Sequence, residues 1–162
     1  MQLKMMLAST LSFMAAAVPP RLPRQALVVS GLDEVVLDDA PIEPSWIVSG
    51  DPRARSGLHS AANDQSASTH VWECTAGTFR WHFGWEETVL ILSGSVTVTA
   101  EDGTVRTLRA GDIGYFAGGT WATWAIDDHV RKLAFCRRTM PLPLAFALRM
   151  KSAMREMLSP AA

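Results

Sequence analysis

The feature that most constrains the fold is a tight hairpin at Asp102-Gly103, set between two apolar-rich segments. An Asp-Gly pair supplies the backbone positions with positive φ that a two-residue hairpin turn requires. Ser95 to Ala100 precedes the pair and Thr104 to Leu108 follows it, and both are predicted strands. A second turn, rich in glycine, follows from Gly111 to Gly119. This part of the chain therefore predicts a compact antiparallel β unit.

Apolar and polar residues alternate in the segments 70–75 and 78–83, which is typical of strands with one buried face. Thr88 to Leu92 is apolar on both faces, as expected of a central strand that is covered on both sides. Short strands at this spacing, separated by glycines, indicate a β-sandwich or a small barrel, so the predicted fold class is all-β. The remaining predicted strands are 46–48, 70–75, 78–83, 113–116, 122–126 and 130–136.

The segments before and after these strands have a different composition. Residues 1–40 are interpreted as an N-terminal arm, with a signal peptide or a linker as the alternatives. Lys4 precedes an apolar stretch that ends in Ala15 to Ala17, small residues where a signal peptidase would cut. We expect a cytoplasmic protein, with export as the alternative if residues 1–17 are a signal peptide.

The C-terminal segment, residues 139–162, is predicted to be a helical tail. Pro141 and Pro143 end the strand pattern, and Leu144 to Leu158 places apolar residues near one face of a short helix. Such a helix packs on the β domain or on a partner subunit. A role at a membrane surface is the alternative, because the other side of this helix is basic.

The charge balance and the length of the apolar N-terminal stretch exclude two kinds of partner. The net charge is −1, from 15 basic and 16 acidic residues, so no nucleic-acid partner is expected. The apolar N-terminal stretch is too short to cross a bilayer, so stable membrane insertion is not expected either.

Cys74 and Cys136 form no CxxC pattern. They are interpreted as buried thiols in a reducing compartment, with a pairing across the sheet as the alternative.

Several short motifs, in a fixed order, give residues 41–138 a resemblance to the cupin superfamily. The chain is similar to the small single-domain branch grouped with the (S)-ureidoglycine aminohydrolase cupin domain. This resemblance implies a double-stranded β-helix (jelly-roll) barrel, and it implies a homodimer. The motifs are Trp72 to Gly77, Phe79-x-Trp81, Glu87 with Gly94, Glu101 to Gly103, Gly111-Asp112, Gly119 with Trp124, and Val130 to Lys132.

The resemblance also implies where a metal would bind. Cupins that use a metal are expected to bind it with two histidines one residue apart, a glutamate four or five residues later, and a third histidine in the second motif. Here Glu87 occupies the glutamate position, His82 the second histidine position and Arg80 the first, while Ala122 stands in place of the third histidine. The metal site is therefore degenerate. His82 and Glu87 are its two remaining ligands if a divalent metal ion is bound.

Without a metal, the same residues suggest a binding site. Arg80 is a natural clamp for a carboxylate or ureide-like group. His82 beside the Glu87 carboxylate suits a general acid or base. Trp121 and Trp124 are expected to line the pocket, with core packing as the alternative.

Two alternative arrangements stay open. In one, Arg80 and Glu87 form an ion pair at the barrel mouth and His82 is a hydrogen-bonded wall residue. In the other, the strand register is shifted so that Trp81 and Phe83 point inward and fill the barrel. Arg80 and His82 then lie outside.

Three functions follow from these readings. The first is a cupin-domain protein that binds a small polar metabolite and has a degenerate metal site. The second is a metal-dependent enzyme of the aminohydrolase, isomerase or dioxygenase type with atypical ligands. The third is a structural or regulatory dimer module whose barrel is filled by side chains.

Overall fold

The computed structural model describes residues 25–141 and the separate residues 143, 146–147, 150–151 and 154. The signal-peptide alternative for residues 1–17 lies outside this range, and so does most of the helix predicted for 144–158. No helix among the described residues is long and apolar enough to cross a membrane.

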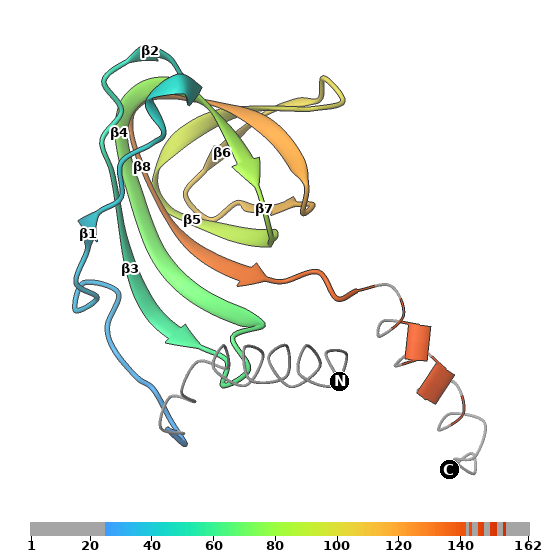
Figure 1. Ribbon diagram of the computed structural model, residues 1–162. Coiled ribbons are helices and arrows are strands. Elements are labelled where there is room, and N and C mark those ends of the chain that lie inside the picture. Colours follow the sequence, from blue (N-terminus) through green and yellow to red (C-terminus); the bar gives the residue numbers. More distant parts are fainter. Residues whose placement is uncertain (1–24, 142, 144–145, 148–149, 152–153, 155–162) are drawn as a thin grey trace, which may run out of the picture.

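The described chain is built almost entirely of strands, as predicted (Figure 1). In chain order the elements are β1 (Asp38–Asp39), the 3-10 helix η1 (Pro44–Trp46), β2 (Ile47–Gly50), β3 (Ala54–Ala61), β4 (Ala67–Phe83), β5 (Glu86–Ala100), β6 (Val105–Arg109), β7 (Ile113–Phe116) and β8 (Thr120–Arg137).

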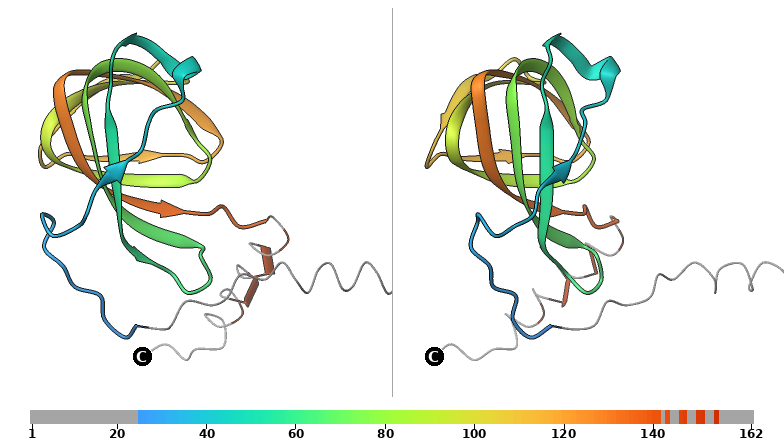
Figure 2. Two further views of the ribbon diagram at one scale, coloured as in Figure 1. Left: turned by 60° about the vertical axis from the view of Figure 1, so that its left-hand side comes forward. Right: turned by 90° about the vertical axis from the view of Figure 1, so that its left-hand side faces the viewer.

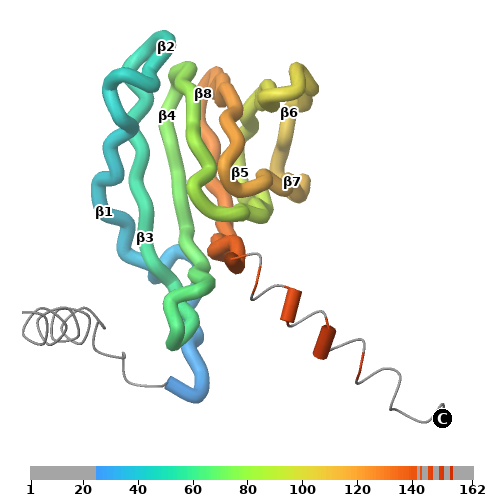
Figure 3. Tube along the Cα trace, turned by 45° about the vertical axis from the view of Figure 1, so that its right-hand side comes forward, coloured from blue at the N-terminus to red at the C-terminus, as the bar shows by residue number. Residues whose placement is uncertain are grey.

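All strands join one antiparallel sheet that rolls around a core. Its order is β1-β3-β4-β8-β5-β6, with β2 paired to β4 and β7 paired to β5. Figure 3 shows β1 and β3 at one end of the rolled sheet and β6 and β7 at the other. The predicted jelly-roll barrel fits this arrangement, but the sheet is not closed. Within the described chain, no pairing joins β1 to β6 and the sheet stays open.

Three long strands replace pairs of shorter predicted ones. Segments 70–75 and 78–83 are both part of β4, 88–92 and 95–100 are both part of β5, and 122–126 and 130–136 are both part of β8. Each long strand bends at a change of register. β4 shifts against β8 between Thr75 and Gly77, and β5 shifts against β8 near Gly94. A β-bulge inserts one residue and bends the strand without ending it, so one continuous strand serves two parts of the roll.

A hairpin forms at the predicted place, but its turn has three residues, 101–103, and of these Gly103 alone has a positive φ. Ser95 to Thr99 of β5 pair with Val105 to Arg109 of β6. Gly103 has a φ of +85° and donates a hydrogen bond of 3.0 Å to the Ala100 carbonyl. The left-handed conformation at Gly103 is the reason that glycine is favoured there.

The described end of the N-terminal arm, from Leu32 to Asp39, crosses the outer face of the sheet beside β3 (Figure 2). Arg131 donates hydrogen bonds of 2.9 Å to the Asp33 carboxylate and to the Leu32 carbonyl. Arg55 donates one of 2.7 Å to the Leu37 carbonyl. Gly57 is buried under this arm, and a Cβ there would collide with the Val36 carbonyl oxygen. The arm is therefore attached to the sheet by charged side chains over a position that admits only glycine.

The inner face of the sheet carries an aromatic core. Phe79 and Trp124 are each 1% exposed, and their rings stack with centroids 6.4 Å apart. Phe83 stacks on Phe116 with centroids 4.3 Å apart. Trp72 packs edge-on against Trp124 at 5.9 Å. Large rings bury much apolar area, so this cluster accounts for much of the stability of the roll.

Candidate functional site

The register of β4 decides which predicted site residues face inward. Phe79 and Phe83 are buried, whereas Arg80 is exposed and His82 is half-buried. The shift at Thr75/Gly77 moves the inward positions from Trp72 and Cys74 to Phe79 and Phe83, which changes their parity. The alternative register is therefore the one observed, with Arg80 and His82 on the face opposite the core.

Arg80 and His82 lie against Trp121 on that outer face. The Arg80 guanidinium carbon is 4.8 Å from the centre of the Trp121 ring, and the His82 ring is 4.9 Å from it. His82 and Trp121 are cross-strand partners in β4 and β8. The predicted cluster of Arg80, His82 and Glu87 does not form, because Glu87 belongs to the inner face.

Glu87 has a different partner, Lys132, and both lie in the interior of the roll. The Lys132 ammonium donates a hydrogen bond of 2.6 Å to Oε1 of Glu87, and the two side chains are only 6% and 13% exposed. Lys132 Nζ also lies 4.8 Å from the centre of the Trp72 ring and 4.4 Å from that of Trp124. The two electron-rich faces and the carboxylate together compensate the charge of a buried ammonium.

Lys132 points into the interior because it is one of the alternate residues of β8 that face inward. Val130, Ala134 and Ala122 point inward with it and are buried. Lys132 pairs across the sheet with Trp72 of β4 and with Ile91 of β5. In the sequence, Lys132 stood out only as a member of the Val130 to Lys132 motif. Its place in an otherwise apolar inward alternation was the signal that it is buried.

The titratable groups nearby show the effect of burial. Burial, opposed in part by the Glu87 carboxylate, lowers the pKa of His70. Burial raises the pKa of Cys74 to about 11 and that of Cys136 to about 11, and the Glu87 charge adds to the rise at Cys136. Both thiols are free, so the alternative of a disulfide across the sheet is wrong.

These residues do not fit a bound metal ion. His82 and Glu87, the two predicted ligands, lie on opposite faces of the sheet, and Glu87 is bound to a fixed cation. Within the described ranges, no group of three His, Cys, Asp or Glu side chains is placed to hold a metal. Ala122, at the position of the third histidine, is buried and supplies no ligand.

Trp121 and Trp124, the predicted pocket walls, have separate surroundings. Trp124 is in the core beside Lys132. Trp121 lines a recess of about 460 Å³ between the β5–β6 hairpin and the β7–β8 segment. Glu101 and Asp102 are the charged residues of that recess. Among the residues that the structure describes, no cationic side chain lines it, so it is poorly suited to an anion.

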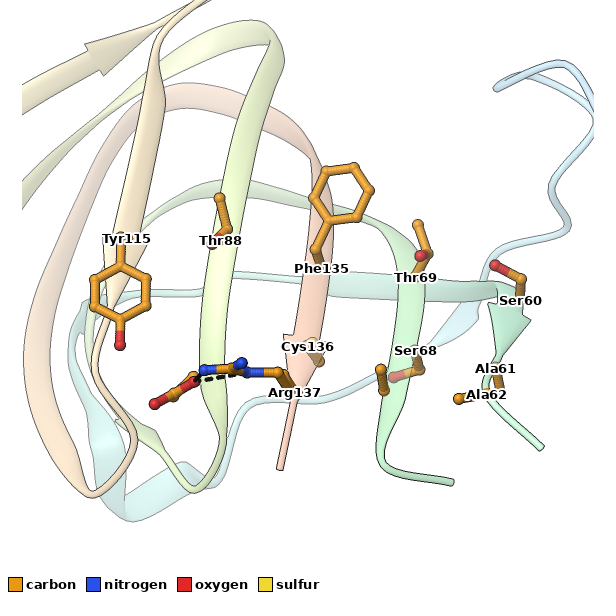
Figure 4. A pocket seen from close by; sticks show the side chains of 12 residues that line it. Ser60, Ala61, Ala62, Ser68, Thr69, Thr88, Tyr115, Phe135, Cys136 and Arg137 are labelled. Atoms are coloured by element: carbon orange, nitrogen blue, oxygen red, sulfur yellow. Dashed lines mark hydrogen bonds and ion pairs between the residues drawn. The ribbon is translucent and has the colours of Figure 1, made fainter. Parts of the chain in front are cut away.

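A second recess, here called the outer groove, crosses five strands on the outer face (Figure 4). Its volume is about 380 Å³. Its centre is one row of cross-strand neighbours from β7 to β3, which are Tyr115, Thr88, Phe135, Thr69 and Ser60. Glu86, Arg137 and small residues of β3 and β4 line the rest.

Arg137 and Glu86 supply the charge of the outer groove. Arg137 Nε donates a hydrogen bond of 2.9 Å to Glu86 Oε2, and its Nη2 donates to the same oxygen. The hydrogen bond and the charge of Glu86 raise the pKa of Arg137. Neither residue was predicted to be part of a site, because the sequences of β5 and β8 do not show which of their residues become cross-strand neighbours.

Comparisons with known proteins agree with this architecture. Residues 61–134 match the family model of the EutQ-like cupin domain. No curated protein matches the sequence. A protein of unknown function from Pseudomonas syringae pv. tomato, of the DUF861 family, is 24% identical with a TM-score of 0.58 over 64% of this chain. The chain spans only 45% of the length of that protein.

Two further structures share the fold at lower identity. A predicted oxalate decarboxylase from Thermotoga maritima is 16% identical, with a TM-score of 0.54 over 70% of this chain and 99% of its own. A cupin 2 conserved barrel domain protein from Rhodopseudomonas palustris is 13% identical, with a TM-score of 0.55 over 72% of this chain and 83% of its own.

Proposed function

We propose that this chain, a cupin-superfamily protein with an EutQ-like cupin domain at residues 61–134, binds a small polar metabolite without using a metal ion in its interior. The observation that carries the proposal is the ion pair of Lys132 with Glu87. In the cupin resemblance, Glu87 stands at the position of a metal-ligating glutamate. Here its carboxylate is already neutralised by an ammonium that belongs to the protein.

A metal ion would have to displace Lys132 to reach Glu87. Displacement would leave the ammonium buried without a counter-charge between Trp72 and Trp124, which is costly. The alternative of a metal-dependent aminohydrolase, isomerase or dioxygenase therefore has no support in the arrangement of these residues. The resemblance to the (S)-ureidoglycine aminohydrolase cupin domain remains a reason to test ureides as ligands.

The interior is also a poor place for a metabolite. Buried aromatic rings fill it: Phe79 contacts both Trp72 and Trp124, and Phe83 stacks on Phe116. Protein interiors are close-packed, and opening a space of metabolite size among such rings would cost several contacts. The recesses on the outside of the roll are better candidates for the binding site.

A thermal-shift screen of ureides, amino acids and small carboxylates tests the proposal. A ligand that binds only the folded state raises the unfolding temperature as its concentration exceeds the dissociation constant. We expect at least one such compound, and we expect the shift to be the same in the presence of EDTA. A shift that disappears with EDTA would contradict the metal-independent reading, and the absence of any shift would contradict ligand binding itself.

The filled interior also favours a second candidate, a structural or regulatory dimer module. Ile113 is 71% exposed and Tyr115 is 61% exposed, and both are on β7 at the same outer face. Apolar side chains at such a face are often covered by a partner. A homodimer that persists at nanomolar protein concentration in sedimentation experiments, together with a negative ligand screen, would favour this candidate. A monomer would exclude it.

A further inference from the structure

We propose that the outer groove is the binding site and that it takes a small planar carboxylate on the row that runs from Tyr115 through Thr88 to Phe135. This inference rests on the proposed function, which states that a small polar metabolite binds but not where. The outer groove is the described recess in which a cation, hydroxyl groups and two aromatic rings lie together.

The spacing of the strands sets the distance between the two rings. Tyr115 of β7 and Phe135 of β8 are both cross-strand partners of Thr88, so they lie on alternate strands with β5 between them. Neighbouring strands are about 4.8 Å apart, which places the two backbone positions about 9.6 Å apart. That separation leaves room for one flat group that lies over Thr88 and reaches the exposed rings of Tyr115 and Phe135 (Figure 4).

Both rings are accessible to a ligand. Tyr115 is 61% exposed and Phe135 is 46% exposed. Figure 4 shows the two side chains on either side of Thr88. An exposed aromatic ring favours a planar ligand over a bulky saturated one, because offset stacking needs two flat surfaces in contact.

The charged side chains of the outer groove are Glu86 and Arg137, which neutralise each other, and Arg137 keeps one nitrogen available as a donor to an anion. Arg137 uses Nε and Nη2 for Glu86, so within the described part of the chain its Nη1 has no side-chain or backbone acceptor. Its side chain is 70% exposed. A guanidinium with a free edge binds a carboxylate well, since the hydrogen bond is charge-assisted. The Thr88 and Thr69 hydroxyls add polar partners along the floor.

The other recess does not offer this chemistry. Trp121 and Phe116 line it, but its charged residues are Glu101 and Asp102. Two carboxylates at its rim repel an anion. The acidic recess therefore disfavours an anion, whereas the outer groove offers it a guanidinium, and a charged ligand and its neutral analogue distinguish the two recesses.

The test is a titration of the full chain with benzoate, followed by amide chemical shifts in NMR spectra. Benzamide serves as the neutral planar analogue and cyclohexanecarboxylate as the saturated anion. We expect benzoate to bind at least tenfold more tightly than either, with the largest shift changes at Thr88, Phe135 and Thr69. Arg137→Gln should weaken benzoate at least tenfold. Arg106→Gln, which changes an exposed arginine on β6, is the matched control and should leave it unchanged.

Tyr115→Ala tests the ring independently of the charge. Tyr115 is largely exposed, so the variant is expected to fold, and benzoate affinity should fall at least fivefold. Benzoate binding that is indifferent to Arg137→Gln and Tyr115→Ala would overturn the inference. The proposed function would still hold if another compound in the screen binds. Self-association that is lost in Tyr115→Ala, without any benzoate binding, would show that the outer groove is an interface between copies and would also overturn it.

Discussion

Lys132 and Glu87 form an ion pair in the interior of the roll, with Nζ 2.6 Å from Oε1. They come from β8 and β5, and 45 positions separate them in the sequence. A buried pair of this kind is often no better for stability than two apolar side chains, but removing one partner is costly because the other charge stays buried. The relationship gives the first two predictions.

We predict that Lys132→Met lowers the free energy of unfolding by about 3–5 kcal/mol, because it leaves the Glu87 carboxylate buried without a partner. Urea unfolding of the variant measures this. The double variant Glu87→Met with Lys132→Met removes both charges, and its free energy of unfolding should return close to that of the natural sequence. Arg106→Met is the control for loss of an exposed cation. A double variant as unstable as the single one would show that packing around Lys132, not charge, matters.

Metal removal should leave the protein unchanged. Dialysis against EDTA is expected to shift neither the unfolding temperature nor the tryptophan fluorescence, because Lys132 supplies the cation that Glu87 requires. Elemental analysis before dialysis gives the metal content directly. One metal ion per chain, with a loss of stability on its removal, would refute the interpretation of the interior.

Truncation of two neighbouring residues of β4 should lower stability by very different amounts. Phe79→Ala removes a ring that is 1% exposed and should cost about 3–5 kcal/mol. Arg80→Ala removes an exposed side chain stacked on Trp121, a contact worth about 0.5–1 kcal/mol. Denaturant unfolding of both variants is a direct test of the strand register. Equal losses would mean that Arg80 faces the core.

The two thiols predict a decline of stability at alkaline pH. Burial raises the pKa of Cys74 and of Cys136 from 9.0 to about 11, so the folded state favours the protonated thiols. This contribution is complete below about pH 9 and is lost as the pH rises through about 11. The free energy of unfolding should therefore fall over that window in reducing buffer. The fall should be smaller in a Cys74→Ala, Cys136→Ala variant, since other groups titrate equally in both proteins.

Local features of the fold were predictable from the sequence, whereas the faces of the strands were not. The place of the β5–β6 hairpin depends on a left-handed position that Gly103 supplies, so it was predictable, although the turn is one residue longer than a two-residue Asp-Gly turn. The inward face of Thr78 to Phe83 depends on one inserted residue near Gly77, which reverses the face of every later side chain. Along 78–83, aromatic residues alternate with Arg80 and His82, and either set could face inward. The sequence does not show where the extra residue lies.

The candidate site was less predictable for the same reason. Glu87 was predicted to be a catalytic residue or a metal ligand, whereas its observed partner is Lys132, which is far from it in the sequence. The outer groove combines Tyr115, Thr88 and Phe135 from three strands, and no two of these are close in sequence. Tertiary pairing creates both features.

The open ends of the sheet carry opposite charges. β1 is only two residues long and consists of Asp38 and Asp39, whereas β6 carries Arg106 and Arg109 and is largely exposed. An unpaired strand edge is a template for aggregation, and natural proteins protect it by shortness or by charge. Two copies that meet edge to edge through the same strand would oppose like charges. The rolled sheet thus avoids fibre-like stacking of identical edges without closing into a barrel.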